Sequence, residues 1–135
     1  MYRRILVAVA PDHPETIDEM LQVARGLAEP GATIEALSVV SAIPTYIEVH
    51  IPKSIYQASA EEVRQKLEQG LAGQEGVERA VEVGKPSEEI LAYQQRGGHD
   101  LIVLRSHNPT IGDMVLGSTA ARIVRNARCS VHVIR

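Results

Sequence analysis

The sequence predicts an α/β fold in which a doubly wound, parallel sheet of five strands carries helices on both faces. Five stretches with strand character alternate with four stretches that have helical periodicity, from one end of the chain to the other. Residues 5–10 and 100–104 are short, almost uninterrupted apolar runs, which are typical of parallel strands buried on both faces. This alternation favours right-handed crossovers that place the helices against the sheet.

The first strand and the first helix have the clearest boundary signals. The apolar run over residues 5–10 ends at a proline. Within residues 12–31, apolar side chains recur at the spacing of an amphipathic helix. Asp12 or His13 is the expected N-cap, with a proline early in the helix. Residues 30–31, a Pro-Gly pair, are expected to stop the helix.

The remaining elements follow from the same periodicities and from glycine and proline at their ends. They are a strand over 32–40, a loop over 41–53, a helix over 54–71, a strand over 77–83, a helix over 86–96, a strand over 100–104, a helix over 118–126 and a strand over 130–134.

Composition narrows the functional classes. The 135 residues fit one domain spanning 1–135, with an ordinary hydrophobic content of 44%. The aromatic residues are four tyrosines, so the core is expected to be aliphatic. A formal net charge of -3 argues against a broad electrostatic contact with nucleic acid. Because Cys129 is the one cysteine, an internal disulfide and a cysteine-based metal cluster are excluded.

The chain is expected to be cytoplasmic. The apolar run near the N-terminus ends at Pro11, too early for a secretory signal, and no stretch approaches the length of a membrane span. We therefore expect no membrane partner.

In folds of this class, ligands bind at the carboxyl ends of the strands, where the strand order reverses. The loops after the first and the fourth strand are the expected walls of that crevice. A P-loop, GxxxxGK[ST], is absent from the sequence, and so is a GxGxxG turn after the first strand.

The segment after the fourth strand allows two interpretations. Gly117, Ser118 and Thr119 stand at a predicted helix start, where unpaired backbone N–H groups and the helix dipole favour an anion. His107 and Asn108 add donors, so the segment has the parts of a phosphate site. Alternatively, Ser118 or Thr119 only caps the helix and Gly117 only allows a turn, which is the commoner use of such residues.

Several spaced motifs resemble those of the universal stress protein family along the whole chain. They are ILVAV at 5–9, LSVV at 37–40, VGKPSEEIL at 83–91, DLIV at 100–103 and LGSTAARIVRNARCSVHVIR at 116–135. The resemblance implies a Rossmann-like sheet of the adenine-nucleotide alpha-hydrolase type and a homodimer joined through the last strand, residues 130–134. Many members bind ATP or a related adenine nucleotide, and others bind none.

The family's nucleotide loop, G-x2-G-x9-G-[ST], maps onto this chain with changes. Its first two glycines fall at Arg105 and Asn108, and its closing pair falls at Gly117 and Ser118. Eight residues instead of nine separate Asn108 from Gly117, as in a branch with SHRPG-like loops. The implied nucleotide-binding residues are Ala8, Val9, Ala10, Val39, Leu104, Arg105, Ser106, His107, Asn108, Gly117, Ser118 and Thr119. ATP or AMP is the implied ligand, with Mg²⁺ only if ATP binds.

Two departures weaken that site. The family usually has an aspartate where this chain has Ala10, and losing a buried acceptor removes about 1–3 kcal/mol of binding. Asp12 is a candidate substitute. Arg105 replaces a small residue where the backbone passes the ligand, and it either fills that space or pairs with phosphate.

Three functions remain open on the sequence alone: a dimeric nucleotide-binding regulatory module with a weakened site, a nucleotide-free interaction protein for another protein partner, and a slow ATPase. The ATPase lacks a carboxylate placed to hold Mg²⁺ and a base other than His107. His99 is expected to be a turn residue, and Cys129 a packed one. The apolar residues of the loop over 41–53 either cover a ligand, pack on a dimer partner or close the core.

Overall fold

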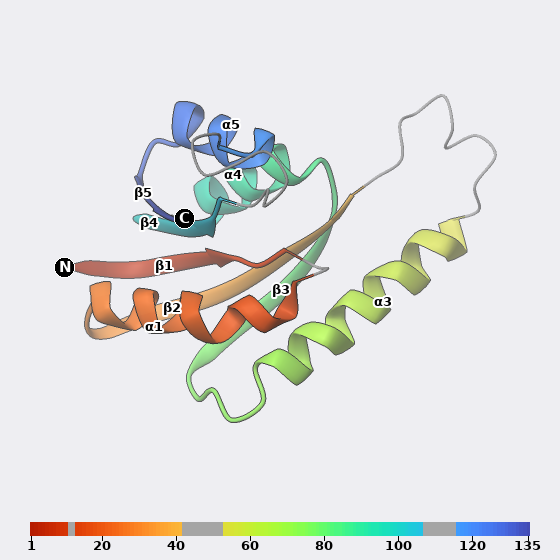
Figure 1. Ribbon diagram of the computed structural model, residues 1–135, viewed down its shortest axis with the longest axis horizontal. Helices are drawn as coiled ribbons and strands as arrows, with labels where there is room; N and C mark the ends of the chain where they lie inside the picture. Colours follow the sequence, from red (N-terminus) through yellow and green to blue (C-terminus); the bar gives the residue numbers. More distant parts are fainter. Residues whose placement is uncertain (11–12, 42–52, 107–115) are drawn as a thin grey trace.

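A five-stranded parallel sheet in the order β3-β2-β1-β4-β5 forms the centre of the molecule (Figure 1). The computed structural model describes residues 1–10, 13–41, 53–106 and 116–135. Its elements are β1 (Tyr2–Ala8), a 3-10 turn (Pro14–Thr16), α1 (Ile17–Leu27), β2 (Ala28–Ser41), α3 (Lys53–Gly70), β3 (Val77–Gly84), α4 (Pro86–Gly97), β4 (Leu101–Arg105), α5 (Ser118–Asn126) and β5 (Ser130–Ile134). The predicted fold class is confirmed.

The direction of winding changes at the centre of the sheet. From β1 the chain steps outward to β2 and β3, and it then returns to the other side of β1 to add β4 and β5. Both β2 and β4 are parallel neighbours of β1, with Ile5 in register with Ile34 on one side and with Leu101 on the other. The carboxyl ends of β1 and β4 therefore flank the switch point, where ligands bind in such sheets.

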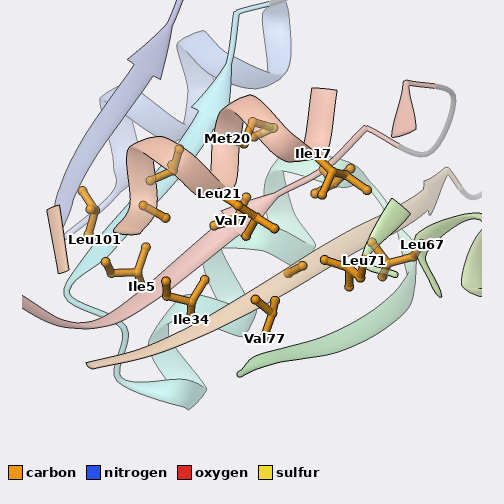
Figure 2. Packing of buried hydrophobic residues seen from close by; sticks show 14 residues of the cluster. Ile5, Val7, Ile17, Met20, Leu21, Ile34, Leu67, Leu71, Val77 and Leu101 are labelled. Atoms are coloured by element: carbon orange, nitrogen blue, oxygen red, sulfur yellow. The ribbon is translucent and has the colours of Figure 1, made fainter. Parts of the chain in front are cut away.

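Two aliphatic cores form because successive residues of the buried strands point to opposite faces. Ile5 and Val7 of β1 face α1 and α3, whereas Leu6 faces α4 and α5. Figure 2 shows the first core, in which Ile5 and Val7 pack together with Ile17 and Leu21 of α1. Figure 1 shows the corresponding layers, with α1 and α3 on one side of the sheet and α4 and α5 on the other.

The first helix begins later than its sequence signals predict. His13 accepts a hydrogen bond from the backbone of Thr16, and Pro14–Thr16 form a 3-10 turn before α1 starts at Ile17. The predicted N-cap at Asp12 or His13 is therefore wrong for His13, and Asp12 lies outside the described residues. Thr16 occupies the N-cap position, and its hydroxyl donates to the carbonyl of His13 at 2.8 Å, so the turn and the helix are joined.

The Pro-Gly pair at residues 30–31 does not stop α1. The helix ends at Leu27, and β2 starts at once with Ala28. The pairing with β1 shifts from Tyr2↔Ala28 to Arg4↔Thr33, so the pair lies in an irregular part of the strand where Gly31 has a φ of 82°. Glycine suits that position because side chains disfavour a positive φ.

The boundary after α4 agrees with the sequence. Gly98 has a φ of 67°, and its N–H donates to the carbonyl of Gln94, which is a common helix ending. The predicted end at residues 97–98 is confirmed. Among the helices of the described ranges, none is both long enough and apolar enough to cross a membrane.

Candidate functional site

A cleft of about 540 Å³ opens at the carboxyl ends of the central strands. Its walls come from the end of β1 and the residues after it, from the ends of β2 and β4, and from the starts of α4 and α5. The cleft therefore lies at the topological switch point of the sheet, and its volume is in the usual range for small-molecule sites.

Most of the predicted site residues line this cleft. Those brought together there are Ala8, Val9, Ala10, Val39, Leu104, Arg105, Gly117, Ser118 and Thr119. Ser106 is not among the lining residues, and its backbone N–H donates to the carbonyl of Ile134 at 2.8 Å. His107 and Asn108 lie outside the described residues.

The cleft also contains residues that the sequence did not single out. They are Val40, Ser41, Pro86, Ala120 and Ile123. Available signals were the VGKPSEEIL stretch, which places Pro86 at a helix start on the same edge of the sheet, and the helical spacing that puts Ala120 and Ile123 on one face of α5.

The start of α5 gives the cleft a polar wall without a side-chain cap. Gly117 occupies the N-cap position with φ -59° and ψ 157°, and no side chain of the described residues caps the helix. The interpretation that Ser118 or Thr119 caps α5 is therefore wrong, since both lie inside the first turn. The φ of Gly117 is one that any residue adopts. The first N–H groups of α5 consequently have no helical partner, and they line a cleft at the positive end of the helix dipole.

A buried serine supports the end of β1. Ser38, 1% exposed, donates its hydroxyl to the carbonyl of Val9 at 2.8 Å. The N–H of Val9 donates in turn to the carbonyl of Leu37 at 2.8 Å. These two bonds hold the chain against β2 as it leaves the sheet. Ala10 follows with a methyl side chain, so the position that carries an acid in the resembled family offers no carboxylate here.

Arg105 is the charged residue among the described residues that line the cleft. Its guanidinium does not stand free in the opening but forms an ion pair with the carboxylate of Glu19 on α1. The two side chains are 32% and 55% exposed, respectively. The ion pair therefore joins the end of β4 to α1 across the end of β1.

His99 follows α4 at the turn, as predicted. Its side chain is fully buried, and its Nε2 atom lies 2.9 Å from Oε1 of Glu35 on β2. It lines no part of the cleft. Cys129 is half-buried, and burial raises the pKa of its thiol, which fits the predicted packing role.

Together these features describe what the cleft can hold. Its floor is aliphatic, formed mainly by the strand ends and by one face of α5, and its rim carries hydroxyls, helix N–H groups and the paired Arg105. In the described part of the chain, no group of three or more His, Cys, Asp or Glu side chains is arranged to hold a metal ion. The geometry suits a ligand with a flat or apolar body and an anionic end.

The comparisons with known proteins agree with this geometry. The model of the universal stress protein family matches residues 1–135. The chain belongs to the universal stress protein family. The archaeal universal stress protein of Methanothermobacter thermautotrophicus is 28% identical over 146 residues, covering 100% of this chain and 97% of the relative.

Solved structures of universal stress proteins have the same architecture. The protein UspA from Lactobacillus plantarum superposes with a TM-score of 0.71 at 26% identity, over 99% of this chain and 98% of that one. A family member from Arabidopsis thaliana, crystallised with AMP bound, superposes with a TM-score of 0.58 at 18% identity, over 98% and 90% of the two chains. At that identity the second likeness shows the fold alone.

Proposed function

We propose that this universal stress protein is a dimeric regulatory module that binds an adenine nucleotide, ATP or AMP, in the cleft at the switch point. The observation that carries the proposal is the meeting of three elements at one opening: the ends of β1 and β4 and the N-terminal turn of α5. The AMP complex of the Arabidopsis thaliana relative supports the choice of ligand.

Each part of the nucleotide has a matching part of the cleft in this proposal. The adenine ring lies on the apolar surface of Val9, Val39 and Val40, where backbone groups at the strand ends read its edge. The phosphates lie at Gly117 and Thr119, where N–H groups without a partner inside the helix and the helix dipole favour negative charge. Because Ala10 supplies no acceptor for the nucleoside, affinity is expected to be lower than in a site with an acid there.

Mg²⁺ enters this proposal only with ATP. Among the described residues that line the cleft there is no carboxylate. The phosphate oxygens of ATP and water molecules would therefore be the ligands of Mg²⁺. The proposed role is binding, with hydrolysis slow at most.

Isothermal titration with ATP and AMP tests the proposal, together with mass spectrometry of small molecules released from freshly purified protein. Thr119→Glu places a carboxylate at the proposed phosphate position and is expected to weaken both nucleotides by more than tenfold. Val124→Glu adds the same charge on an exposed position of the same helix and is the matched control. Unchanged binding by Thr119→Glu would contradict this placement of the phosphates.

The proposed dimer uses β5, which lies at an edge of the sheet. The carbonyl of Ile134 accepts the N–H of Ser106 from the β4 side, so alternation along the strand turns the backbone groups of Val133 toward the open edge. Val133→Pro removes one of those outward donors and is expected to give a monomer in sedimentation, with far-UV circular dichroism as the check on folding. If the dimer persists in this variant, its interface does not use β5.

A nucleotide-free interaction protein is the second candidate, and the pairing of Arg105 with Glu19 favours it, since the cation at the cleft already has a partner. The same titration separates the two candidates. Absence of heat with millimolar ATP and AMP favours the second.

A further inference from the structure

Arg105 has an unusual path between two cavities. It lines the cleft and also a small cavity of about 30 Å³, which lies against the start of α1. Ala8 and Ala10 line both cavities as well. The long side chain of Arg105 therefore lies beside the methyl groups of Ala8 and Ala10 at the end of β1, and it reaches Glu19 on α1.

The two departures from the family pattern are complementary in this arrangement. A carboxylate at the position of Ala10 would stand beside the same cavities as the guanidinium and compete with Glu19 for it. The alanine leaves room for the arginine and removes that competitor.

We propose that Arg105 is the anion-recognising side chain of the cleft and that a phosphate-bearing ligand draws it away from Glu19. This inference rests on the proposed function and names how occupancy of that site is sensed. Glu19 is more than half exposed, so its ion pair is screened by water and weak. A phosphate offers the guanidinium charge-assisted, bidentate hydrogen bonds, which are stronger.

The exchange has a consequence outside the cleft. When Arg105 turns to the ligand, the carboxylate of Glu19 is left on the exposed surface of α1 without its cation. The surface of α1 thereby changes charge with occupancy, and adenosine, which carries no phosphate, does not cause the change.

A double-mutant cycle read by titration calorimetry with ATP tests the exchange. Glu19→Gln removes the competitor and is expected to tighten ATP binding about two- to fivefold, the range for partly exposed ion pairs. Arg105→Gln is expected to weaken ATP about tenfold and to abolish the effect of Glu19→Gln. Asp18→Asn, which removes a neighbouring charge of α1 while keeping an acceptor for Gln74, is expected to match the unaltered chain.

Two outcomes overturn the exchange: equal gains from Glu19→Gln and Asp18→Asn, which indicate a general charge effect, or a gain that persists in the Arg105→Gln background. Inorganic tripolyphosphate, followed by its effect on the melting temperature, separates this inference from the proposed function. If tripolyphosphate stabilises the protein only when Arg105 is present, and no nucleotide binds, the exchange is supported and the adenine nucleotide is contradicted as the ligand. No response to either probe overturns both proposals.

Discussion

The imidazole of His99 and the carboxylate of Glu35, 64 positions apart in the chain, form a buried pair with 2.9 Å between Nε2 and Oε1. The other oxygen of Glu35 accepts the hydroxyl of Tyr93 at 2.7 Å, and the Tyr93 and His99 rings stack with centroids 6.0 Å apart. Side chains of Glu35 and His99 are 13% and 0% exposed. This cluster fastens β2 to the turn between α4 and β4, away from the cleft, so its role is in stability.

Replacing His99 with alanine is expected to lower the free energy of unfolding by about 2–4 kcal/mol, because Glu35 loses one partner and a cavity remains. Urea unfolding of the ligand-free chain measures the loss. Gln95→Ala, on an exposed position of α4, is the control and is expected to change stability by less than about 0.5 kcal/mol. Similar losses for the two variants would show that the His99–Glu35 pair contributes no specific stability.

Two helical glycines predict opposite responses to alanine. A Cβ on Gly97 would meet the ring of His99, with Nδ1 at 2.7 Å, so Gly97→Ala is expected to destabilise the protein by about 1–3 kcal/mol. Gly26 in α1 has no atom within 4 Å of such a Cβ, and Gly26→Ala is expected to stabilise by about 0.5–1 kcal/mol. Thermal melts measure the two variants. A double variant, Gly97→Ala with His99→Ala, checks that the His99 ring is what the Cβ at position 97 clashes with. The clash is disproved if the double variant shows no relief.

Tyr93 predicts a loss of stability at alkaline pH. Burial, with the hydrogen bond to Glu35 and its charge, raises the pKa of Tyr93 to about 12 from an ordinary value of 10.0. Because the folded-state pKa is the higher one, its contribution is complete below pH 10 and is lost as the pH rises toward 12. Tyrosinate absorbance is expected to show a late step that Tyr93→Phe removes. A titration unchanged by that substitution would contradict the assignment.

Asp100 predicts the opposite dependence at acid pH. Burial alone would raise its pKa, but the backbone N–H groups of Arg3 and Arg4, each 2.9 Å from a carboxylate oxygen, outweigh burial and lower the pKa below 3.8. The folded-state pKa is depressed, so the contribution is present above about pH 3.8 and is lost as the pH falls through the folded-state pKa. Asp100→Asn is expected to be destabilised at pH 7, with a difference from the unaltered chain that shrinks toward pH 3 in urea titrations. A constant difference would rule out the carboxylate as its source.

Gly117 predicts a conflict between stability and binding. Because it is an N-cap without a capping side chain, Gly117→Asp is expected to stabilise α5 by about 0.3–1 kcal/mol through the cap and the helix dipole. The same carboxylate would stand where the proposed phosphates bind, so nucleotide affinity is expected to fall. Chemical unfolding and calorimetry on one preparation measure both effects. Gly117→Ser supplies a neutral cap as the comparison, and equal nucleotide affinities for the two variants would contradict the charge argument.

Local pattern was sufficient for the sheet and for the location of the cleft. Apolar runs such as residues 101–104 are buried at both faces whatever their partners, and the carboxyl ends of parallel strands meet at one edge. The sequence therefore determined the five strands, the switch point and the meeting of the carboxyl ends of β1 and β4. Family motifs added the start of α5 to the same opening.

Tertiary structure decided the features that depend on a distant partner. Residues 30–31 carry a helix-stop signal, yet pairing with β1 draws them into the irregular start of β2. His99 is predicted from the sequence only as a turn residue, and the fold brings Glu35 beside it. The sequence left two interpretations of Arg105 open, filling space or pairing with phosphate, and its ion pair with Glu19 depends on the packing of α1 against the sheet. Periodicity reports which face of an element is buried, whereas the partner of a charged or polar side chain is set by contacts that the local sequence does not encode.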